Sequence, residues 1–348
     1  MLKKLTVENF ANFDKAEFNF VPGINIIIGE NSSGKSHVLK LAYSIASVWN
    51  RIGKEGWKKS LKDKLYGVFK VSKLFDLQSF GFDADGQRQT RMLFEFSVNH
   101  KSRESEKLDI TLGVDSITVN NQHPTAPLLM SPIFFPAKEA LSLFPNFITL
   151  YEKYHLSFDE TYYDLCRAID SPLLKEPNQK LIDSIESIVG GKFVLRDGGF
   201  YLETEKGLIN IFMVAEGWRK LGMLSYLIAN DSLKKGSILF WDEPETNLNP
   251  RLVKRLAEIL VELTKYQIQV VIATHNLFLL KYFDYLTSID PENVPTAFFN
   301  LIRNEKGVQV ESGNRFKNIA HVAALDEEIA LYDKEQEAFY SRLENSES

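Results

Sequence analysis

The sequence predicts an α/β protein with a central sheet flanked by helices, and three stretches carry this prediction. The apolar run 24–28 predicts a strand, and a glycine-containing turn separates it from apolar residues at helical spacing over 38–49. Two further apolar runs, 236–241 and 268–273, predict strands on either side of a helix over 252–263. Strands that alternate with helices in this way are typical of a sheet covered by helices.

The turn after the first strand fits the phosphate-binding pattern G-x-x-x-x-G-K-[ST]. Glycines at both ends of the turn allow the backbone to bend, so that successive N–H groups and the N-terminus of the helix face a phosphate. The lysine places a positive charge at the β- and γ-phosphates, and the hydroxyl group after it is a ligand for Mg²⁺. The pattern predicts a nucleoside triphosphate site and does not distinguish ATP from GTP. Its residues are Gly29, Glu30, Asn31, Ser32, Ser33, Gly34, Lys35 and Ser36, with His37 beside them.

Two acidic residues, Asp242 and Glu243, end the strand at 236–241. Because successive side chains of a strand point in opposite directions, the two carboxylates can perform different tasks. We expect Asp242 to hold Mg²⁺ together with Ser36, and Glu243 to orient and deprotonate the attacking water. His275 follows the next strand. We expect it to contact the γ-phosphate, although a histidine at a strand end is more often a structural hydrogen-bonding group.

The composition excludes several classes of protein. A net charge of −5 argues against a broadly basic nucleic-acid-binding protein. The single cysteine, Cys166, excludes an internal disulfide and a cysteine-based metal site. No stretch approaches 18 uninterrupted apolar residues, and no apolar run follows the basic N-terminus, so we expect no membrane partner and a cytoplasmic location.

The N-terminal third outside the phosphate loop is rich in predicted strands. Alternating apolar residues over 2–28 predict three strands, the last of which leads into the loop. Further strands at 91–98, 108–112 and 116–119 predict an antiparallel side sheet, preceded by a loop at 81–90.

The middle of the chain changes to helix after a short strand at 133–135. Residues 139–189 are predicted to be mostly helical, with breaks at Pro145, Pro172 and Pro177. The turn 197–199 then predicts a hairpin. The tail carries an acidic amphipathic helix, for which we favour packing on its own domain over docking to a partner. Its apolar face is Leu325, Ile329, Tyr332, Phe339 and Leu343.

The segment 51–73 has a local charge of +6 with interleaved aromatic residues. One interpretation is a surface that contacts nucleic-acid phosphates and stacks bases. The other, which we favour, is a solvated helix face whose aromatic residues belong to the core. The basic residues are Arg51, Lys54, Lys58, Lys59, Lys62, Lys64, Lys70 and Lys73, and the aromatic residues are Trp57, Tyr66 and Phe69.

The acidic pair, the turn from Asn247 to Pro250 and the strand that ends in Thr274-His275 together resemble the ABC-type ATPases of the RecF- and SMC-like branch. This branch includes OLD-family ATPases and AAA-type ATPases of bacterial anti-phage systems. The resemblance covers about residues 1–48 and 210–303. It implies Mg²⁺-dependent ATP hydrolysis and a P-loop NTPase fold of the ABC-ATPase type with a mixed central sheet. The antiparallel β side-sheet and the helical insertion are predicted by the strand and helix patterns described above. The sequence offers no heptad run for a coiled-coil arm and no nuclease constellation.

The resemblance also implies a head-to-tail dimer, in which each copy presents a signature loop to the ATP of the other. The candidate loop residues are Ala215, Glu216 and Gly217, although Ala215 stands where serine is usual and Glu216 adds an anion. A Gly217 at a helix start would offer backbone N–H groups to a γ-phosphate. Asn247 and Asn249 match the D-loop at the dimer interface, and Gln78 is the candidate for the glutamine that senses Mg²⁺.

We therefore expect an ATPase domain at 1–135 and 190–310, with a basic insertion at 51–90, a helical subdomain at 136–189 and a C-terminal helix within 311–348. The expected function is an ATPase whose homodimer or larger homo-oligomer controls a separately encoded effector in anti-phage defence. A RecF-like repair ATPase that binds DNA through 51–73 is the alternative, and a transporter subunit is disfavoured by the unusual signature loop.

Overall fold

The computed structural model describes residues 1–78, 89–97, 104–128, 131–144, 146–154, 156–305 and 307–346. Its central sheet has six strands in the order β14-β13-β3-β12-β11-β7. All neighbouring pairs are parallel except β13 with β14, so the sheet is mixed, as predicted. The strands are β3 (Ile24–Gly29), β7 (Pro132–Phe135), β11 (Ile238–Asp242), β12 (Gln269–Thr274), β13 (Thr296–Asn304) and β14 (Gly307–Gly313).

The central sheet separates two hydrophobic cores, because alternate residues of each strand point to opposite faces. Ile24, Ile26 and Ile28 of β3 pack in the core that contains α7 and α8, whereas Ile27 packs in the core that contains α1. The helices are α1 (Lys35–Val48), α7 (Pro250–Lys265) and α8 (Leu277–Ile289). Since both faces are covered, the strands read as continuous apolar runs in the sequence.

An antiparallel sheet covers the other side of α1 and confirms the predicted side sheet. Its strand order is β2-β1-β4-β5-β6. The strands are β1 (Leu2–Phe10), β2 (Phe13–Asn19), β4 (Thr90–Ser97), β5 (Ser105–Leu112) and β6 (Ile117–Val119). The predicted loop at 81–90 lies largely outside the described residues.

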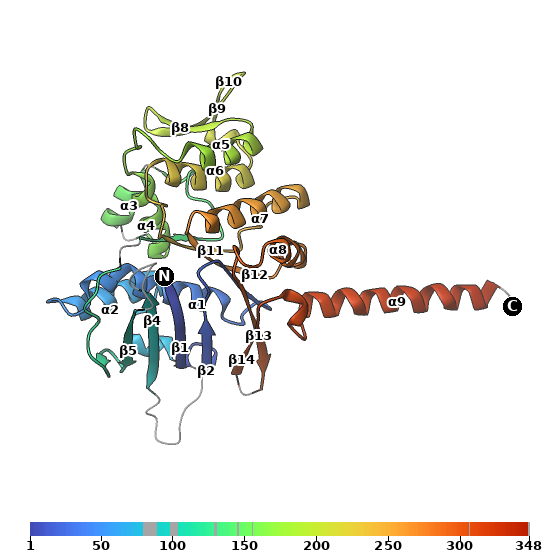
Figure 1. Cartoon of the computed structure of the whole chain (residues 1–348), viewed down its shortest axis with the longest axis horizontal. Coiled ribbons are helices and arrows are strands. Elements are labelled where there is room, and N and C mark those ends of the chain that lie inside the picture. Colours follow the sequence, from blue (N-terminus) through green and yellow to red (C-terminus); the bar gives the residue numbers. More distant parts are fainter. Residues whose placement is uncertain are drawn as a thin grey trace.

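A second group of elements forms a lobe above the central sheet (Figure 1). The predicted hairpin is confirmed, and a third strand that the sequence did not predict extends it to the order β10-β9-β8. The described part of the predicted helical stretch forms three helices, and the break at Pro145 lies outside that part. The elements are α3 (Asn146–Tyr154), α4 (Glu160–Ile169), α5 (Gln179–Val189), β8 (Lys192–Arg196), β9 (Gly199–Thr204), β10 (Gly207–Asn210) and α6 (Glu216–Ala229).

The basic segment forms α2 (Trp57–Phe69), and its side chains favour the solvated-helix interpretation. Trp57 is buried, and the Phe69 ring stacks on the His37 ring at 5.9 Å. Lys62 forms an ion pair with Asp115. Lys64 is buried and Lys70 bonds the Leu156 carbonyl group, so three of the cations are already engaged within the protein.

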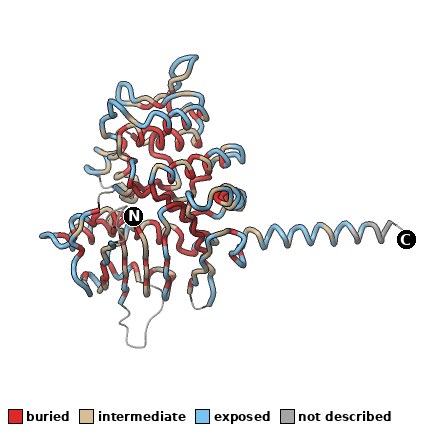
Figure 2. The backbone as a smooth tube through the Cα atoms, viewed as in Figure 1, coloured by how far each residue is buried: buried red, intermediate tan, exposed pale blue. Residues whose placement is uncertain are grey.

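The prediction that the C-terminal helix packs on its own domain is wrong over most of its length. Helix α9 (Ala323–Ser346) projects away from the body as a single helix (Figure 1), and its surface is mostly exposed (Figure 2). Leu325 at its base packs against the core, and Lys281 of α8 bonds Glu328. Farther along, Ile329, Tyr332 and Phe339 are exposed, and the side chain of residue 343 lies outside the described part.

Among the described residues, no helix combines the length and the apolar character needed to cross a bilayer.

Candidate nucleotide site

The phosphate loop lies between β3 and α1, as predicted. Gly34 has φ +99°, and an added Cβ would lie 2.8 Å from the Phe13 ring, so both conformation and space require glycine there. The Nζ atom of Lys35 bonds the carbonyl oxygens of Gly29 and Glu30, both at 2.8 Å. Burial lowers the pKa of Lys35. An amide from the neighbouring sheet, Asn12, donates a hydrogen bond to the Ser32 carbonyl group and fixes the far side of the loop.

The two acidic residues lie close to this loop because β12 is the only strand between β3 and β11. Burial, the largest effect, raises the pKa of Asp242, whereas the nearby Ser36 side chain lowers it. Within the described part of the chain, Asp242 Oδ1 is buried and has no hydrogen-bond partner. A buried carboxylate oxygen without a partner beside a serine hydroxyl group fits Mg²⁺, which takes few protein ligands and completes its shell with phosphates and water.

Glu243 is held from three directions. Its Oε1 atom lies 3.3 Å from Nδ1 of His275, and Thr246 donates a hydrogen bond to its Oε2 atom at 3.4 Å. Its backbone N–H group bonds the Ala273 carbonyl oxygen of β12 at 2.9 Å. Its φ of +48° is in the left-handed region, which non-glycine residues adopt at a cost of about 1–3 kcal/mol. The arrangement brings together Glu243 and His275, two residues that the sequence assigned to the site.

Sequence reasoning missed Lys220, which supports this loop from α6. Lys220 is fully buried, and its Nζ atom lies 3.4 Å from the Glu243 carbonyl oxygen and 3.0 Å from that of Thr246. Burial lowers the pKa of Lys220, and the nearby carboxylates, Glu216 foremost, oppose this shift. The signal available in the sequence was helical spacing, which places residue 220 on the same face as Gly217, Leu221 and Leu224.

Glu245 is a second residue that the sequence analysis did not assign. Thr274 at the end of β12 donates a hydrogen bond of 2.6 Å to its Oε1 atom, and Oε2 is buried without a partner among the described residues. Burial raises the pKa of Glu245. This side chain ties the loop after β11 to the strand that ends at His275, and thereby fixes the spacing between Glu243 and His275.

The signature-loop candidate begins α6, as predicted, and packs on the D-loop candidate of the same chain. An added Cβ at Gly217 would lie 2.2 Å from Leu248 Cδ2 and 3.1 Å from the Asn247 carbonyl oxygen. The N-cap residue Ala215 has no side-chain acceptor, so no side chain caps the first N–H groups of the helix. Asn249 caps α7 by accepting a hydrogen bond from the Leu252 N–H group at 3.1 Å, whereas Asn247 is exposed with φ +65°.

The structure places two further candidates near the loop without a contact to Asp242 or Glu243. The backbone of Gln78 pairs with Phe10 beside the turn that carries Asn12, and its role toward Mg²⁺ stays a prediction. The His37 ring stacks on Phe69, which turns it toward α2.

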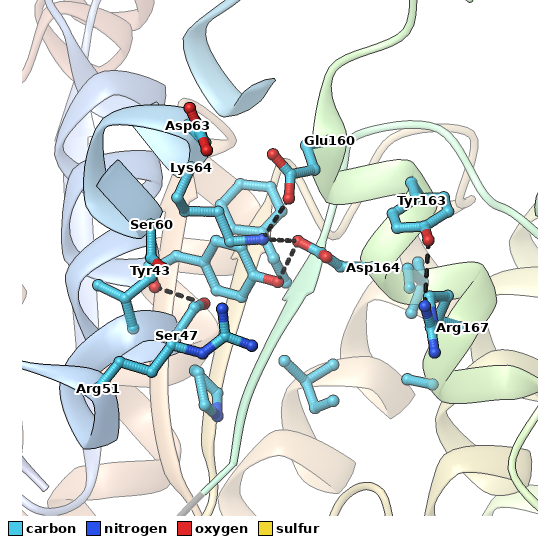
Figure 3. Close-up of a pocket in the computed structure, with 16 residues that line it drawn as sticks. Tyr43, Ser47, Arg51, Ser60, Asp63, Lys64, Glu160, Tyr163, Asp164 and Arg167 are labelled. Atoms are coloured by element: carbon cyan, nitrogen blue, oxygen red, sulfur yellow. Dashed lines mark hydrogen bonds and ion pairs between the residues drawn. The ribbon is translucent and has the colours of Figure 1, made fainter. Parts of the chain in front are cut away.

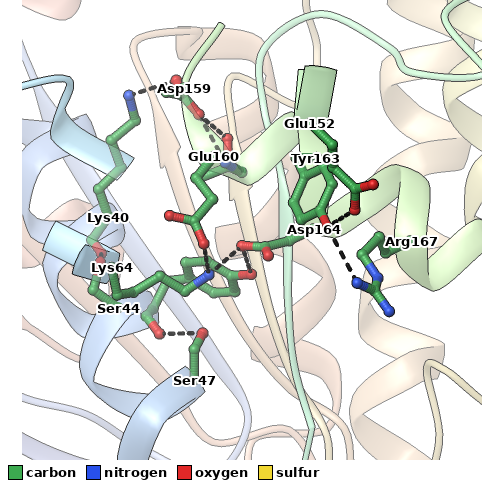
Figure 4. Close-up of polar contacts among 12 residues, drawn as sticks. Lys40, Ser44, Ser47, Lys64, Glu152, Asp159, Glu160, Tyr163, Asp164 and Arg167 are labelled. Carbon is green, nitrogen blue, oxygen red and sulfur yellow. Dashed lines mark hydrogen bonds and ion pairs between the residues drawn. The ribbon is translucent and has the colours of Figure 1, made fainter. Parts of the chain in front are cut away.

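A polar joint connects the phosphate-loop helix to the upper lobe. Lys64 of α2 bonds Glu160 at 2.8 Å and Asp164 at 2.7 Å, and the Tyr43 hydroxyl group of α1 donates to the same Asp164 oxygen at 2.7 Å (Figure 3). These residues line a cavity of about 590 Å³. Lys40, one turn after the loop, bonds Asp159 at the start of α4 (Figure 4). Helix α4 is thus tied to the helix that begins at Lys35.

Residues 24–281 match the family described as "AAA domain, putative AbiEii toxin, Type IV TA system". The chain belongs to this family. The match contains the phosphate loop, the acidic pair, the signature-loop candidate and His275, and it identifies an AAA-type ATPase domain.

Solved structures with a similar fold include heads of SMC proteins, which confirms the predicted fold class. An SMC head bound to the C-terminal winged-helix domain of ScpA is 15% identical, with a TM-score of 0.55 over 91% of this chain and 98% of that chain. The SMC head domain from Thermotoga maritima is also 15% identical, with a TM-score of 0.52 over 89% and 98%. At this identity the likeness concerns the fold alone.

Curated relatives include the DNA replication and repair protein RecF of Halalkalibacterium halodurans, 40% identical over 45 residues, and that of Streptococcus gordonii, 44% identical over 45 residues. The match covers 13% of this chain and only 12% of each RecF protein.

Proposed function

We propose that the protein is a Mg²⁺-dependent ATPase in which Glu243 is the general base. The observation that carries the proposal is the pairing of an Asp242 oxygen, buried and without a partner in the described part of the chain, with a Glu243 carboxylate oriented by His275. Ser36 and Asp242 would hold Mg²⁺, which when bound neutralises charge on the phosphates. Glu243 takes the proton of the attacking water, His275 orients the Glu243 carboxylate, and Lys35 contacts the phosphates.

We further propose that ATP closes two copies head to tail, with Ala215–Gly217 of one copy at the γ-phosphate bound to the other, and that this dimer controls a separately encoded effector. The uncapped start of α6 supports the first part, because no side chain accepts a hydrogen bond from the first N–H groups of the helix. The family description, which names a toxin–antitoxin system, supports a setting in bacterial defence.

The decisive experiment compares Glu243→Gln with the parent in ATP turnover and in size-exclusion chromatography with light scattering. We expect a loss of about 10²–10⁴-fold in turnover with retained ATP binding, and accumulation of a dimer on Mg-ATP. Lys35→Ala is the control that should lose ATP binding and remain monomeric. Turnover equal to the parent in Glu243→Gln would show that Glu243 is not the base.

A RecF-like DNA-binding ATPase is the second candidate, and the similarity to RecF over 45 residues favours it. Two lysines of α2, Lys58 and Lys59, remain exposed and are available to phosphates. The Lys58→Glu/Lys59→Glu variant should then weaken DNA binding and reduce its salt dependence. Absence of DNA binding by the parent at low salt would exclude this function.

A further inference from the structure

A short turn before the signature-loop candidate presents two large apolar side chains to solvent. The 3₁₀ turn η3 (Ile211–Met213) joins β10 to α6. Phe212 is 70% exposed, and Met213, at 81%, is the most exposed large hydrophobic residue in the described ranges. Ile211 and Val214 on either side are buried. The turn is therefore anchored by its flanks and directs its two middle residues outward.

Hydrogen bonds fix this turn, so the exposure does not reflect a loose segment. Asn210 accepts a hydrogen bond from the Phe212 N–H group at 3.0 Å, and the Val214 N–H group bonds the Ile211 carbonyl oxygen at 3.1 Å. Leu208 and Ile209 of the edge strand β10 are also exposed, but as successive strand residues they point to opposite faces of the sheet. Large apolar side chains held outward by a hydrogen-bonded turn are typical of a protein–protein contact. We call Phe212 and Met213 the apolar step.

The position of the apolar step indicates which surface it contacts. Phe212 and Met213 are separated from Ala215 only by the buried Val214, and Gly217 is wedged against Asn247 and Leu248. Because only Val214 separates Met213 from Ala215, a surface that receives the loop Ala215–Gly217 also lies next to the apolar step. On the proposed function, from which this inference follows, that surface is the phosphate-loop face of a second copy.

We propose that Phe212 and Met213 pack against the second copy beside its bound nucleotide and supply the apolar part of the ATP-dependent interface. Glu216 places an anion next to a polyphosphate at this contact. Burial of a phenyl ring and a thioether offsets that repulsion, because each large apolar side chain removed from water strengthens association. The apolar step thus stabilises a dimer that the signature loop alone would hold weakly.

The test uses the full chain in the Glu243→Gln background with Mg-ATP. Adding Phe212→Ser and Met213→Ser should weaken dimerisation by at least about 100-fold in sedimentation velocity. Binding of a fluorescent ATP analogue by the monomer should remain unchanged, because neither residue contacts the phosphate loop of its own chain. The matched control is Tyr285→Ser/Ile289→Ser, which removes two exposed apolar side chains from α8 and should leave the dimer intact.

Three outcomes are distinguishable. Loss of the dimer only in the Phe212/Met213 variant, with an unchanged melting temperature, supports the inference. Equal dimerisation by this variant and its Glu243→Gln parent overturns the inference and leaves the proposed function standing. A Glu243→Gln parent that remains monomeric with ATP overturns the proposed dimerisation, and the inference with it.

Discussion

Two buried lysines show how differently this protein treats a charge removed from water. Lys64, in the polar joint, meets two carboxylates, and although burial lowers its pKa, Asp164 and Glu160 outweigh that effect and raise it. Lys220, behind the acidic pair, bonds two carbonyl oxygens and, among the residues that the structure describes, no carboxylate, and burial lowers its pKa. Near Lys220, the Glu245 carboxylate keeps one buried oxygen without a partner in the described structure, as the Asp242 carboxylate does near the phosphate loop. The two lysines thus differ in their partners: Lys64 is paired with two carboxylates, whereas Lys220 bonds backbone carbonyl oxygens.

Of the substitutions that test this comparison, Lys64→Met should have the largest effect on the free energy of unfolding. Removing one partner of a buried ion pair leaves the Glu160 and Asp164 carboxylates uncompensated, and we expect a loss of about 3 kcal/mol in the free energy of unfolding. Urea unfolding followed by circular dichroism measures it. Lys64→Met combined with Asp164→Asn should recover part of the loss. A single variant as stable as the parent would show that the joint is not an ion-paired unit.

Asp242→Asn should raise the free energy of unfolding, in contrast to Lys64→Met. Because the pKa of Asp242 is raised in the folded state, the ionised side chain costs stability above the ordinary carboxyl pKa of about 4, and the cost is complete above the raised value. We expect the amide to add about 1–3 kcal/mol to the free energy of unfolding at pH 7 and to abolish Mg²⁺-dependent hydrolysis. The gain should shrink as the pH falls through the raised pKa of Asp242 and should be lost near pH 4, where the side chain is protonated in the folded and the unfolded state. A difference in melting temperature between Asp242→Asn and the parent that does not change with pH would contradict the raised pKa of Asp242.

The same substitution at the other lysine, Lys220→Met, sharpens the contrast. It removes two hydrogen bonds to carbonyl oxygens but also relieves the burial of a charge, so the free energy of unfolding should change by less than about 2 kcal/mol. The backbone of Glu243 loses its support in the left-handed conformation, and we expect kcat to fall by about tenfold with a KM for ATP close to that of the parent. A higher KM for ATP with an unchanged kcat would instead assign Lys220 a role in ATP binding.

The sequence predicted the parts of the site that are carried by local patterns. Strand-turn-helix context located Gly29–Ser36, and an apolar strand ending in acidic residues located Asp242 and Glu243. The sequence did not predict the roles of Lys220, Glu245 and Thr274, because these roles depend on hydrogen bonds between elements that only the folded chain brings together. The ion pair between Lys64 and Asp164 was not predicted for the same reason, since the two residues are 100 positions apart in the sequence.

The C-terminal helix shows a different limit. The apolar spacing of Leu325, Ile329 and Tyr332 correctly predicted a helix, but the same pattern is produced by a helix that packs on its own domain and by one that does not. Periodicity specifies that a face is apolar and leaves open what covers it. The free position of α9 was therefore decided by tertiary structure and not by the sequence pattern.

The length of helix α9 determines how far its end lies from the body of the protein. At 1.5 Å per residue, 24 helical residues extend about 36 Å, roughly the diameter of a small domain. A fluorophore or fused protein attached at the end of the helix would be held at about that distance from the body. A label at the end of α9 would therefore stand clear of the body of the protein and could report on the proposed closing of two copies.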